Sequence, residues 1–319
     1  MKVLITGGAG FAGSHLAEHL LGQGQDVTVL ARGEEPLVNV EHLRKDVRIE
    51  RGDLLDATRI RQVLEDTRPQ RIYHLAAFSS PRESLQNPKL AYDVNFTGTL
   101  NLLYAWRELG IDSRFLVVSS VAVYGPVDSD TLPLREDAPL RPVSPYAGSK
   151  AAAEMLAGQF FRAYALPIVR VRPFNHTGPR QASSYVCSDF ARQVAEIDLG
   201  LRPPKMTVGH LNVRRDFSDV RDIVRGYSLL MENGEPGEVY QLCSGNCVSI
   251  ESILRRLTAL SSQPIEVEVD ERKLRSEESP VLWGDASKAR RVVGWQLQYD
   301  FETTLRDLKL YWETALRRR

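Results

Sequence analysis

Tyr146 and Lys150 are the two residues whose types and spacing point most directly to chemistry. They follow Ser144-Pro145, a typical helix start with proline in the first turn, so both side chains project from one helix face. Tyrosine has a pKa of about 10, and it is a poor base at neutral pH unless a cation stabilises its phenolate. Lys150 can supply that cation while Tyr146 exchanges a proton during hydride transfer. Taken alone, such a pair is more often a solvated helix face.

Two serines stand where they would complete such a site. The run Phe115–Val118 is predicted to be a buried strand, and it leads directly into Ser119 and Ser120. Ligands of parallel sheets bind at the carboxyl ends of the strands. A serine there can donate a hydrogen bond to a substrate carbonyl or hydroxyl and orient it, whereas simple turn formation is the alternative.

A glycine-rich turn near the N-terminus predicts a dinucleotide site. Three glycines recur at three-residue spacing in Thr6–Gly13, directly after an expected strand and at the start of an expected helix. Without side chains they allow a tight turn and a close approach of pyrophosphate to backbone, while the helix N-terminus supplies N–H donors. The residues predicted to contact the cofactor here are Gly7, Gly10, Phe11, Ala12 and Gly13.

The end of the second expected strand bears on which dinucleotide is bound. A carboxylate there suits the ribose hydroxyls of NAD, whereas an arginine suits the 2′-phosphate of NADP. The strand ends in Ala31-Arg32, which favours NADP(H); NAD(H) stays possible because Glu34 or Glu35 would reach the ribose after a loop shift. After the third strand, Asp53-Leu54 is predicted to meet the adenine, with Asp53 as a mere turn residue the alternative.

Short β-branched runs alternate with segments of helical periodicity over the first 172 residues. This alternation predicts an α/β fold with a doubly wound parallel sheet. The expected strands are Lys2–Thr6, Val27–Leu30, Val47–Arg51, Arg71–Leu75, Phe115–Val118 and Ile168–Arg172. The expected helices are Gly13–Leu21, Ala57–Leu64, Leu90–Leu109 and Pro145–Tyr164.

The order of elements becomes less regular beyond residue 172, where proline and glycine cluster. Helices are still expected at Val220–Met231, Ile250–Leu260 and Phe301–Leu316. We therefore predict a dinucleotide-binding domain over residues 1–172 and a smaller, mainly substrate-binding α/β domain over residues 173–319. Parts of about 211–245 are expected to return to the first domain.

Composition excludes several classes of protein. Lys plus Arg and Asp plus Glu number 41 each, so no overall field attracts nucleic acid or an anionic membrane. No stretch approaches the roughly 20 apolar residues of a membrane span. Three cysteines are too few for a secreted disulfide framework, and Cys243 and Cys247 lack a second pair of metal ligands. We expect a cytoplasmic protein without metal, nucleic-acid or membrane partners.

Nearly the whole chain resembles the extended short-chain dehydrogenases, a group of nucleotide-sugar epimerases, dehydratases and reductases. The resemblance implies a Rossmann fold, Ser120, Tyr146 and Lys150 as a catalytic triad, and Asn95 as a support for its geometry. It also implies a homodimer paired through the helices Leu90–Leu109 and Pro145–Tyr164, and a backbone wall against the cofactor at Leu75-Ala76-Ala77. The matching stretches are Thr6–Gly13, the Asp53 turn, Leu75–Ala77, Asn95–Thr99, Ser119–Gly125, Tyr146–Lys150 and Arg172–Asn175.

The residues after Ser120 bear on the type of reaction. In the 4,6-dehydratases of this family a threonine stands at the serine position, and two acidic residues follow it to move protons during water elimination. This sequence has Val121 and Ala122 instead, and neither side chain can carry a proton. The resemblance therefore favours reduction of a 4-keto group or 4-epimerisation, and both remain open.

The distal half is similar to the GDP-sugar branch of the family, in Arg172–Pro179, in Arg215–Asp222 and in Leu274–Glu278 followed by Gly284. The last stretch resembles GDP-4-keto-6-deoxymannose reductases. It implies that Arg215 and Arg275 hold the diphosphate, that Glu278 accepts hydrogen bonds from ribose hydroxyls, and that Asn175 lies near the phosphates. The alternative for both arginines is a structural salt bridge, which Arg215 would form with Asp216, Asp219 or Asp222.

The sequence thus predicts a GDP-hexose as substrate and an NAD(P)H-dependent reduction of GDP-4-keto-6-deoxymannose to GDP-rhamnose. A nucleotide-sugar 4-epimerase, which consumes no cofactor, is the alternative, and a GDP-mannose 4,6-dehydratase is a weaker one. A non-enzymatic NADP-binding module would keep the glycine turn but would not need the intact triad.

Overall fold

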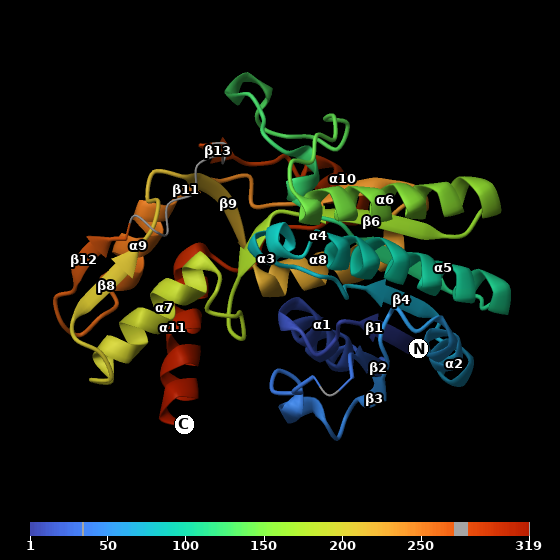
Figure 1. Cartoon of the computed structure of the whole chain (residues 1–319), viewed down its shortest axis with the longest axis horizontal. Coiled ribbons are helices and arrows are strands. Elements are labelled where there is room, and N and C mark those ends of the chain that lie inside the picture. The colour runs from blue at the N-terminus through green and yellow to red at the C-terminus, as the bar shows by residue number, and fades with distance from the viewer. Residues whose placement is uncertain (34, 271–279, 319) are drawn as a thin grey trace.

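The computed structural model describes residues 1–33, 35–270 and 280–318. Within these residues a parallel sheet has the strand order β10-β6-β5-β4-β1-β2-β3 (Figure 1). The order reverses between β1 and β4, where doubly wound sheets open a crevice at their carboxyl ends. The predicted doubly wound sheet is confirmed. Its strands are β1 (Lys2–Thr6), β2 (Asp26–Ala31), β3 (Arg48–Arg51), β4 (Arg71–His74), β5 (Arg114–Val118), β6 (Ile168–Pro173) and β10 (Val239–Leu242).

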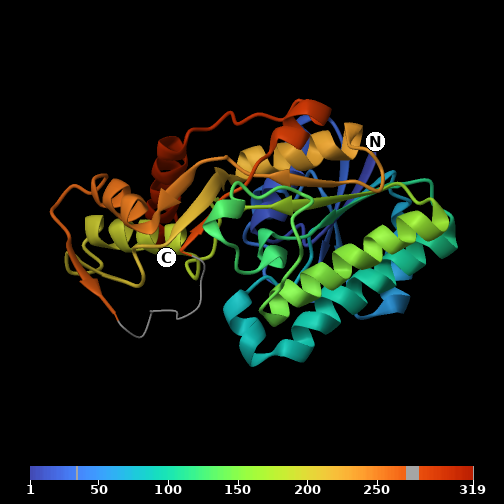
Figure 2. The same cartoon turned by 90° about the horizontal axis from the view of Figure 1, so that it is seen from above.

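The central strands of this sheet contribute to two hydrophobic cores, because successive side chains point to opposite faces. On β1, Val3 and Ile5 belong to one core and Leu4 belongs to the other. Figure 2 shows the two helical layers on either side of the sheet. The first core is covered by α1 (Phe11–Gly22), α8 (Val220–Asn233) and α10 (Ser287–Val293), and the second by α2 (Ala57–Thr67), α5 (Gly98–Leu109) and α6 (Pro145–Tyr164).

A smaller α/β unit packs around a third core, which includes Phe190, Val194, Ile253 and Leu308. Its helices are α7 (Val186–Asp198), α9 (Ile250–Thr258) and α11 (Phe301–Arg317). Strand β9 (Arg214–Asp219) pairs with β7 (Asn175–Thr177), β11 (Cys247–Ser249) and β13 (Val281–Leu282), and β8 (Lys205–Val208) pairs with β12 (Glu266–Val269). Of the later segments, α8, β10 and α10 pack on the large sheet instead.

The predicted helix over Leu90–Leu109 is confirmed, and it contains a π-helical turn that was not predicted. The chain forms α3 (Pro81–Gln86) and α4 (Pro88–Tyr92), then a π-helical turn over Asp93–Thr97, and only then α5. The side chain of Asn95, inside that turn, is hydrogen-bonded to the backbone of Phe78, which lies outside any helix. Such wide turns inside helices are frequent at functional sites. Local periodicity could not predict this one, because the partner of Asn95 lies 17 residues away.

Glycine allows α1 to pack closely on the turn that precedes it. A Cβ atom on Gly13 would overlap the carbonyl oxygen of Gly7 and would lie 2.7 Å from the Cα of Gly8. We expect Gly13→Ala to lower the free energy of unfolding by about 1–3 kcal/mol, measured by urea denaturation. Gly22→Ala is the matched control in the same helix, because a Cβ there has nothing within 4 Å. Equal stability of the two variants would contradict the close packing.

Candidate active site

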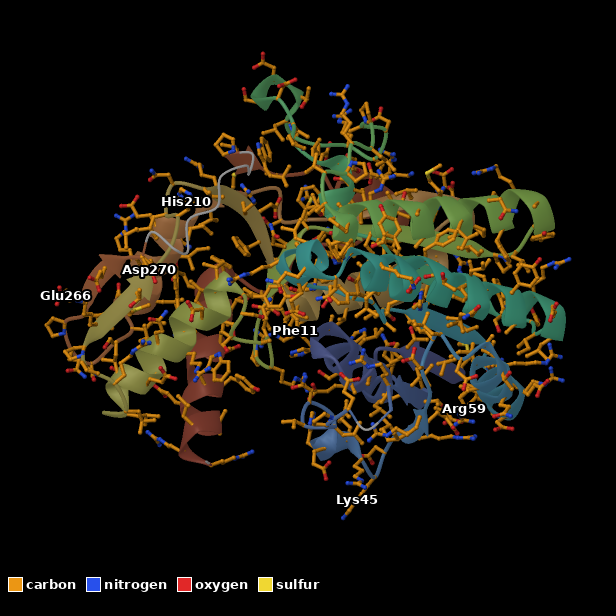
Figure 3. The ribbon with its side chains drawn as sticks, in the orientation of Figure 1. Phe11, Lys45, Arg59, His210, Glu266 and Asp270 are labelled. Carbon is orange, nitrogen blue, oxygen red and sulfur yellow. The ribbon has the colours of Figure 1, made fainter. Side chains whose placement is uncertain are left out.

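The predicted site residues gather at one edge of the large sheet. Because its strands are parallel, Thr6, His74, Val118 and Pro173 all end strands at that edge. The turns that follow these strands carry most of the residues predicted from the sequence. Phe11, labelled in Figure 3, marks the start of α1 at this edge, beside the smaller α/β unit.

The glycine-rich turn has the geometry that a dinucleotide requires. Gly7 has a φ of 68°, and a Cβ on it would lie 2.7 Å from the backbone nitrogen of Ala76. The helix cap at Gly10 has no side chain, and no acidic residue stands in the first turn of α1. The first N–H groups of α1, at Phe11 and Ala12, therefore have no side-chain acceptor and suit a pyrophosphate.

Residues 75–77 form the wall opposite this turn. The backbone nitrogens of Leu75 and Ala76 donate to the carbonyl and hydroxyl oxygens of Thr6, at 3.2 Å in both cases. Ala77 follows in a bend of the chain and is half-buried. The backbone here therefore runs beside the turn, and its contact with a cofactor stays a prediction.

The smaller α/β unit meets the glycine-rich turn through aromatic contacts. The ring of Phe11 stacks on His176, with centroids 5.8 Å apart, and meets His15 edge to face at 5.7 Å. Burial lowers the pKa of His176, whose Nδ1 is hydrogen-bonded to the carbonyl of Phe174 at 2.9 Å. A neutral His176 thus joins the two units beside the turn, a contact that sequence reasoning left unassigned.

The loop after β2 carries an exposed arginine and is held by a second one. Arg32 is exposed, and Nη1 of Arg51 donates to the carbonyl oxygens of Gly33 and Glu35, both at 2.9 Å. Asp53 accepts from the backbone nitrogen of Leu55 at 2.9 Å, which is the turn geometry considered as its alternative role.

Residue Glu34 lies outside the described residues, so its predicted reach toward a ribose has no structural counterpart here. Leu54, beside Asp53, is buried and packs against Gly98 at the start of α5, where a Cβ would lie 2.8 Å from it. The contact of Asp53 and Leu54 with an adenine stays a prediction.

Helix α6 carries the predicted proton-handling pair and begins as the sequence indicates. Ser144 caps it by accepting from the backbone nitrogen of Ala147 at 3.2 Å, and Pro145 is its first residue. Lys150 is 7% exposed, and its Nζ donates to the carbonyl oxygen of Val118, the last residue of β5, at 2.8 Å. Burial lowers the pKa of Lys150 from 10.5 to about 8.

Ser120 and Tyr146 meet across the end of β5. Burial raises the pKa of Tyr146 to about 12, a hydrogen bond with Ser120 opposes that rise, and Tyr185 adds to it. The Oγ of Ser120 also accepts from the backbone nitrogen of Ala122 at 3.2 Å. The fold therefore brings the three residues of the predicted triad to one place, with Ser120 and Tyr146 in direct contact.

Buried polar side chains hold this region together. Asn95 accepts from the backbone nitrogen of Phe78 at 2.7 Å and donates to Ser149 Oγ at 2.9 Å, beside Lys150. These bonds tie Asn95 to α6, and its role as a support for the active site stays a prediction. His74, which sequence reasoning missed, bridges the hydroxyls of Thr6 and Thr99 at 2.7 and 2.8 Å, and burial lowers its pKa to about 3.

Tyr185 also escaped sequence reasoning, although it approaches the triad. It is the cap residue of α7, its hydroxyl donates to the carbonyl oxygen of Ser79 at 3.4 Å, and it raises the pKa of Tyr146 electrostatically. It reaches over from the smaller α/β unit. The sequence offered no signal for it, because α7 itself was not predicted.

The predicted phosphate-binding residues lie on β7 and β9. Asn175 Nδ2 donates to the carbonyl oxygen of Asp216 at 3.3 Å, and Arg215 is half-buried. Within the described residues no salt bridge joins Arg215 to Asp216, Asp219 or Asp222. Asp219 and Asp222 pair with Arg221 and Arg225, and Asp216 accepts from Ser244 and Gly245. Arg275 and Glu278 lie outside the described residues.

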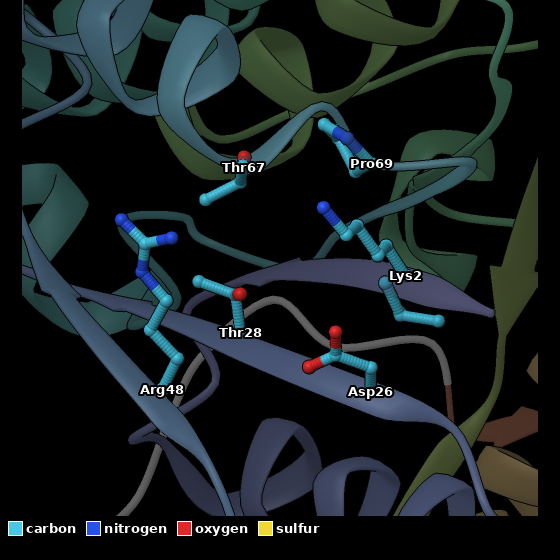
Figure 4. A pocket seen from close by; sticks show the side chains of 7 residues that line it. Lys2, Asp26, Thr28, Arg48, Thr67 and Pro69 are labelled. Atoms are coloured by element: carbon cyan, nitrogen blue, oxygen red, sulfur yellow. The ribbon is translucent and has the colours of Figure 1, made fainter.

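Other sites offer less for chemistry. A cavity of about 70 Å³ at the amino ends of β1 and β2 is lined by Lys2, Asp26, Thr28 and Arg48, on the edge of the sheet opposite the triad (Figure 4). Among the described residues, no three His, Cys, Asp or Glu side chains are grouped to hold a metal ion. The same residues include no helix that is long and apolar enough to cross a membrane.

The buried charge of Lys150 predicts a pH-dependent stability. Because the folded pKa of about 8 lies below 10.5, the unfolded chain binds the proton more tightly, and folding stability rises with pH between these values. Lys150→Met should therefore be more stable than the wild type at pH 7, by up to about 3 kcal/mol, and this advantage should shrink toward pH 10. Urea denaturation at pH 7 and at pH 10 measures the two stability differences. Lys45→Met, at an exposed lysine, is the control. An advantage independent of pH would contradict the assignment.

Comparisons with known proteins agree with this geometry. The chain is 32% identical over 316 residues to a GDP-6-deoxy-D-mannose reductase from Pseudomonas aeruginosa, covering 99% of this chain and 98% of the relative. It is 30% identical over 335 residues to a GDP-mannose 4,6-dehydratase from Sinorhizobium fredii, covering 96% and 93%.

Two solved structures share the whole fold. RMD from Pseudomonas aeruginosa, complexed with NADPH, has a TM-score of 0.87 at 31% identity and covers 99% of this chain and 100% of its own. The Thermus thermophilus UDP-glucose 4-epimerase, in complex with NAD, has a TM-score of 0.86 at 31% identity with the same coverage.

The family model described as GDP-mannose 4,6 dehydratase matches residues 4–308, which include the glycine-rich turn, the predicted triad and most of the smaller α/β unit. The match therefore extends over both structural units rather than the nucleotide-binding half alone. The chain belongs to the GDP-mannose 4,6-dehydratase family and is an enzyme of the short-chain dehydrogenase/reductase type.

Proposed function

We propose that this enzyme reduces the 4-keto group of GDP-4-keto-6-deoxymannose to give GDP-rhamnose. The observation that carries the proposal is the pair Val121-Ala122, directly after Ser120, where dehydration needs side chains that exchange protons. Val121 is buried in the first core. The similarity to a GDP-6-deoxy-D-mannose reductase over nearly its full length supports the same reaction.

We propose NADPH as the reductant, with NADH as the alternative. The glycine-rich turn fits a dinucleotide, because Gly7 and Gly13 let the turn pack tightly against Ala76 and the start of α1, whose first N–H groups suit a pyrophosphate. Beyond β2, Arg32 provides an exposed cation and Ala31 leaves no carboxylate at the strand end. The similarity to a structure complexed with NADPH supports this choice.

The three triad residues have separate tasks in this reaction. Bound NADPH would supply the hydride for the keto carbon. Ser120 donates a hydrogen bond to the keto oxygen, and Tyr146 gives that oxygen its phenolic proton. A pKa of about 12 keeps Tyr146 protonated at neutral pH, as an acid must be. Lys150, with a pKa of about 8, stays largely charged at pH 7 and stabilises the phenolate that remains.

The GDP portion is proposed to lie against β7 and β9. Arg215 offers a planar guanidinium to the diphosphate, and Asn175 lies on the neighbouring strand. Arg275 and Glu278 are proposed to contact the diphosphate and the ribose of the same nucleotide. Asp53 is proposed to contact the adenine of the cofactor at the other end of the site.

The decisive assay combines purified protein with GDP-4-keto-6-deoxymannose and NADPH. We expect one NADPH to be oxidised for each GDP-rhamnose formed. Cofactor absorbance measures the NADPH, and analysis of the product sugar measures the GDP-rhamnose. An epimerase would convert its nucleotide sugar without net oxidation, and a dehydratase would act on GDP-mannose. The absence of NADPH oxidation would refute the reductase assignment.

Removing the phenolic proton should stop the reaction without disturbing the cofactor. Tyr146→Phe is expected to lower kcat about 10²- to 10⁴-fold, while the Kd for NADPH changes by less than about two-fold. Steady-state kinetics and NADPH fluorescence measure the two values. Tyr164→Phe, at the exposed end of the same helix, is the control. Retained turnover in Tyr146→Phe would show that another group supplies the proton.

We also propose a homodimer formed through the helices beside the active site. Apolar side chains remain exposed over this surface. A single exposed apolar residue is ordinary, but a group of them on neighbouring helices indicates an interface. Helices α5 and α6 run side by side (Figure 2). The exposed apolar residues are Leu85, Leu90, Tyr92, Tyr104, Met155 and Tyr164.

A charge at the centre of this surface should prevent pairing. Met155 on α6 is 65% exposed, and Met155→Glu is expected to shift the sedimenting species from dimer to monomer. Leu310→Glu, on α11 and 59% exposed, is the matched control and should leave the dimer intact. A monomeric wild type in sedimentation velocity would contradict the proposed dimer.

A further inference from the structure

A buried ion pair lies behind the predicted triad. Arg172 on β6 is 5% exposed and Glu154 on α6 is 2% exposed. Arg172 donates to Glu154 from Nη2 at 2.6 Å and from Nε at 3.0 and 3.1 Å. The pair raises the pKa of Arg172 against the opposing effect of burial. A buried ion pair is weak evidence for stability, because desolvating two charges offsets much of their attraction.

The guanidinium of Arg172 also donates hydrogen bonds outside the ion pair. Its Nη1 donates to the hydroxyl of Tyr124 at 2.7 Å and to the carbonyl oxygen of Glu136 at 2.8 Å. Tyr124 in turn donates to the carbonyl oxygen of Arg135 at 3.1 Å and accepts from the amide of Gln241 on β10. One arginine therefore joins segments from four parts of the chain, by bonds whose geometry is directional.

These contacts connect the two segments that carry the triad. Tyr146, Lys150 and Glu154 follow one another at four-residue spacing, so they lie along one face of α6. Tyr124 ends a short 3₁₀ helix, η3 (Val121–Tyr124), whose cap residue is Ser120. The hydrogen bonds of Arg172 to Glu154 and to Tyr124 thus link the turn of Ser120 to α6 and fix their relative position.

We propose that Glu154, Arg172 and Tyr124 are positioning residues that hold Ser120 at hydrogen-bonding distance from Tyr146. None of them is proposed to touch substrate or cofactor; they act by fixing η3 against α6. The proposal rests on the proposed function, because the kinetic consequence appears in the keto reduction. Displacing a reacting group by about 1 Å can cost about 100-fold in rate, which gives the expected scale.

Tyr124→Phe is the sharpest variant, because it removes the link to η3 and leaves the ion pair in place. We expect kcat to fall about 10- to 100-fold, with the KM for NADPH unchanged. Tyr240→Phe is the matched control, since Tyr240 is also fully buried and its hydroxyl accepts a hydrogen bond, from the backbone nitrogen of Glu235. An equal fall in both variants, or no fall in Tyr124→Phe, would overturn the proposal.

A double-mutant cycle with Ser120→Ala separates positioning from general weakening. If Tyr124 acts through Ser120, Tyr124→Phe should lower kcat by less than about two-fold once the serine hydroxyl is absent. A merely structural role predicts that the two losses multiply. Multiplied losses would overturn the proposal.

Hydrogen exchange tests the same contact without any substrate. The amides of Val123 and Gly125 donate to the carbonyls of Ser120 and Ala122 within η3. Their exchange should be faster in Tyr124→Phe than in the wild type and unchanged in Tyr240→Phe. If the wild type does not oxidise NADPH, the proposed reaction fails and this measurement still decides the positioning. Unchanged exchange at both amides would overturn it.

Discussion

The parallel pairing of β1 with both β2 and β4 is the constraint on which the rest of the structure depends. Because all strands of the large sheet run the same way, each one ends at the same edge and delivers its following turn there. The order reverses beside β1, and at this edge the glycine-rich turn after β1 contacts Leu75 and Ala76 after β4, whose backbone nitrogens donate to Thr6. Close packing of Gly13 on Gly7 then fixes the direction of α1.

Two buried cations near this edge have pKa values shifted in opposite directions. Arg172 is surrounded by a carboxylate, a hydroxyl and a carbonyl, and its pKa is raised. Lys150 donates to the carbonyl oxygen of Val118, and burial lowers its pKa to about 8. A charge held with so little compensation is costly, and such groups cluster at functional sites. The contrast supports the two proposals, that Lys150 and its neighbours carry the proton chemistry and that Arg172 aligns them.

The smaller α/β unit contributes to the site at several points. His176 stacks on Phe11 at the glycine-rich turn, and Tyr185 reaches the triad from the cap of α7. A ligand lying along the sheet edge would therefore touch both units. Relatives that share this architecture include a reductase, a dehydratase and an epimerase, so the fold alone does not decide the reaction.

The sequence by itself determined the parts of the protein that depend on local order along the chain. The glycine spacing predicted the turn, the apolar runs predicted the large sheet, and Tyr146 with Lys150 predicted a shared helix face, since each signal lies within a few residues. Only the tertiary structure decided the π-helical turn at Asn95, the approach of Tyr185 to Tyr146 and the pairing of Arg172 with Glu154. These depend on partners 17 or more residues apart. Local periodicity carries no information about such contacts, because packing of distant segments selects them.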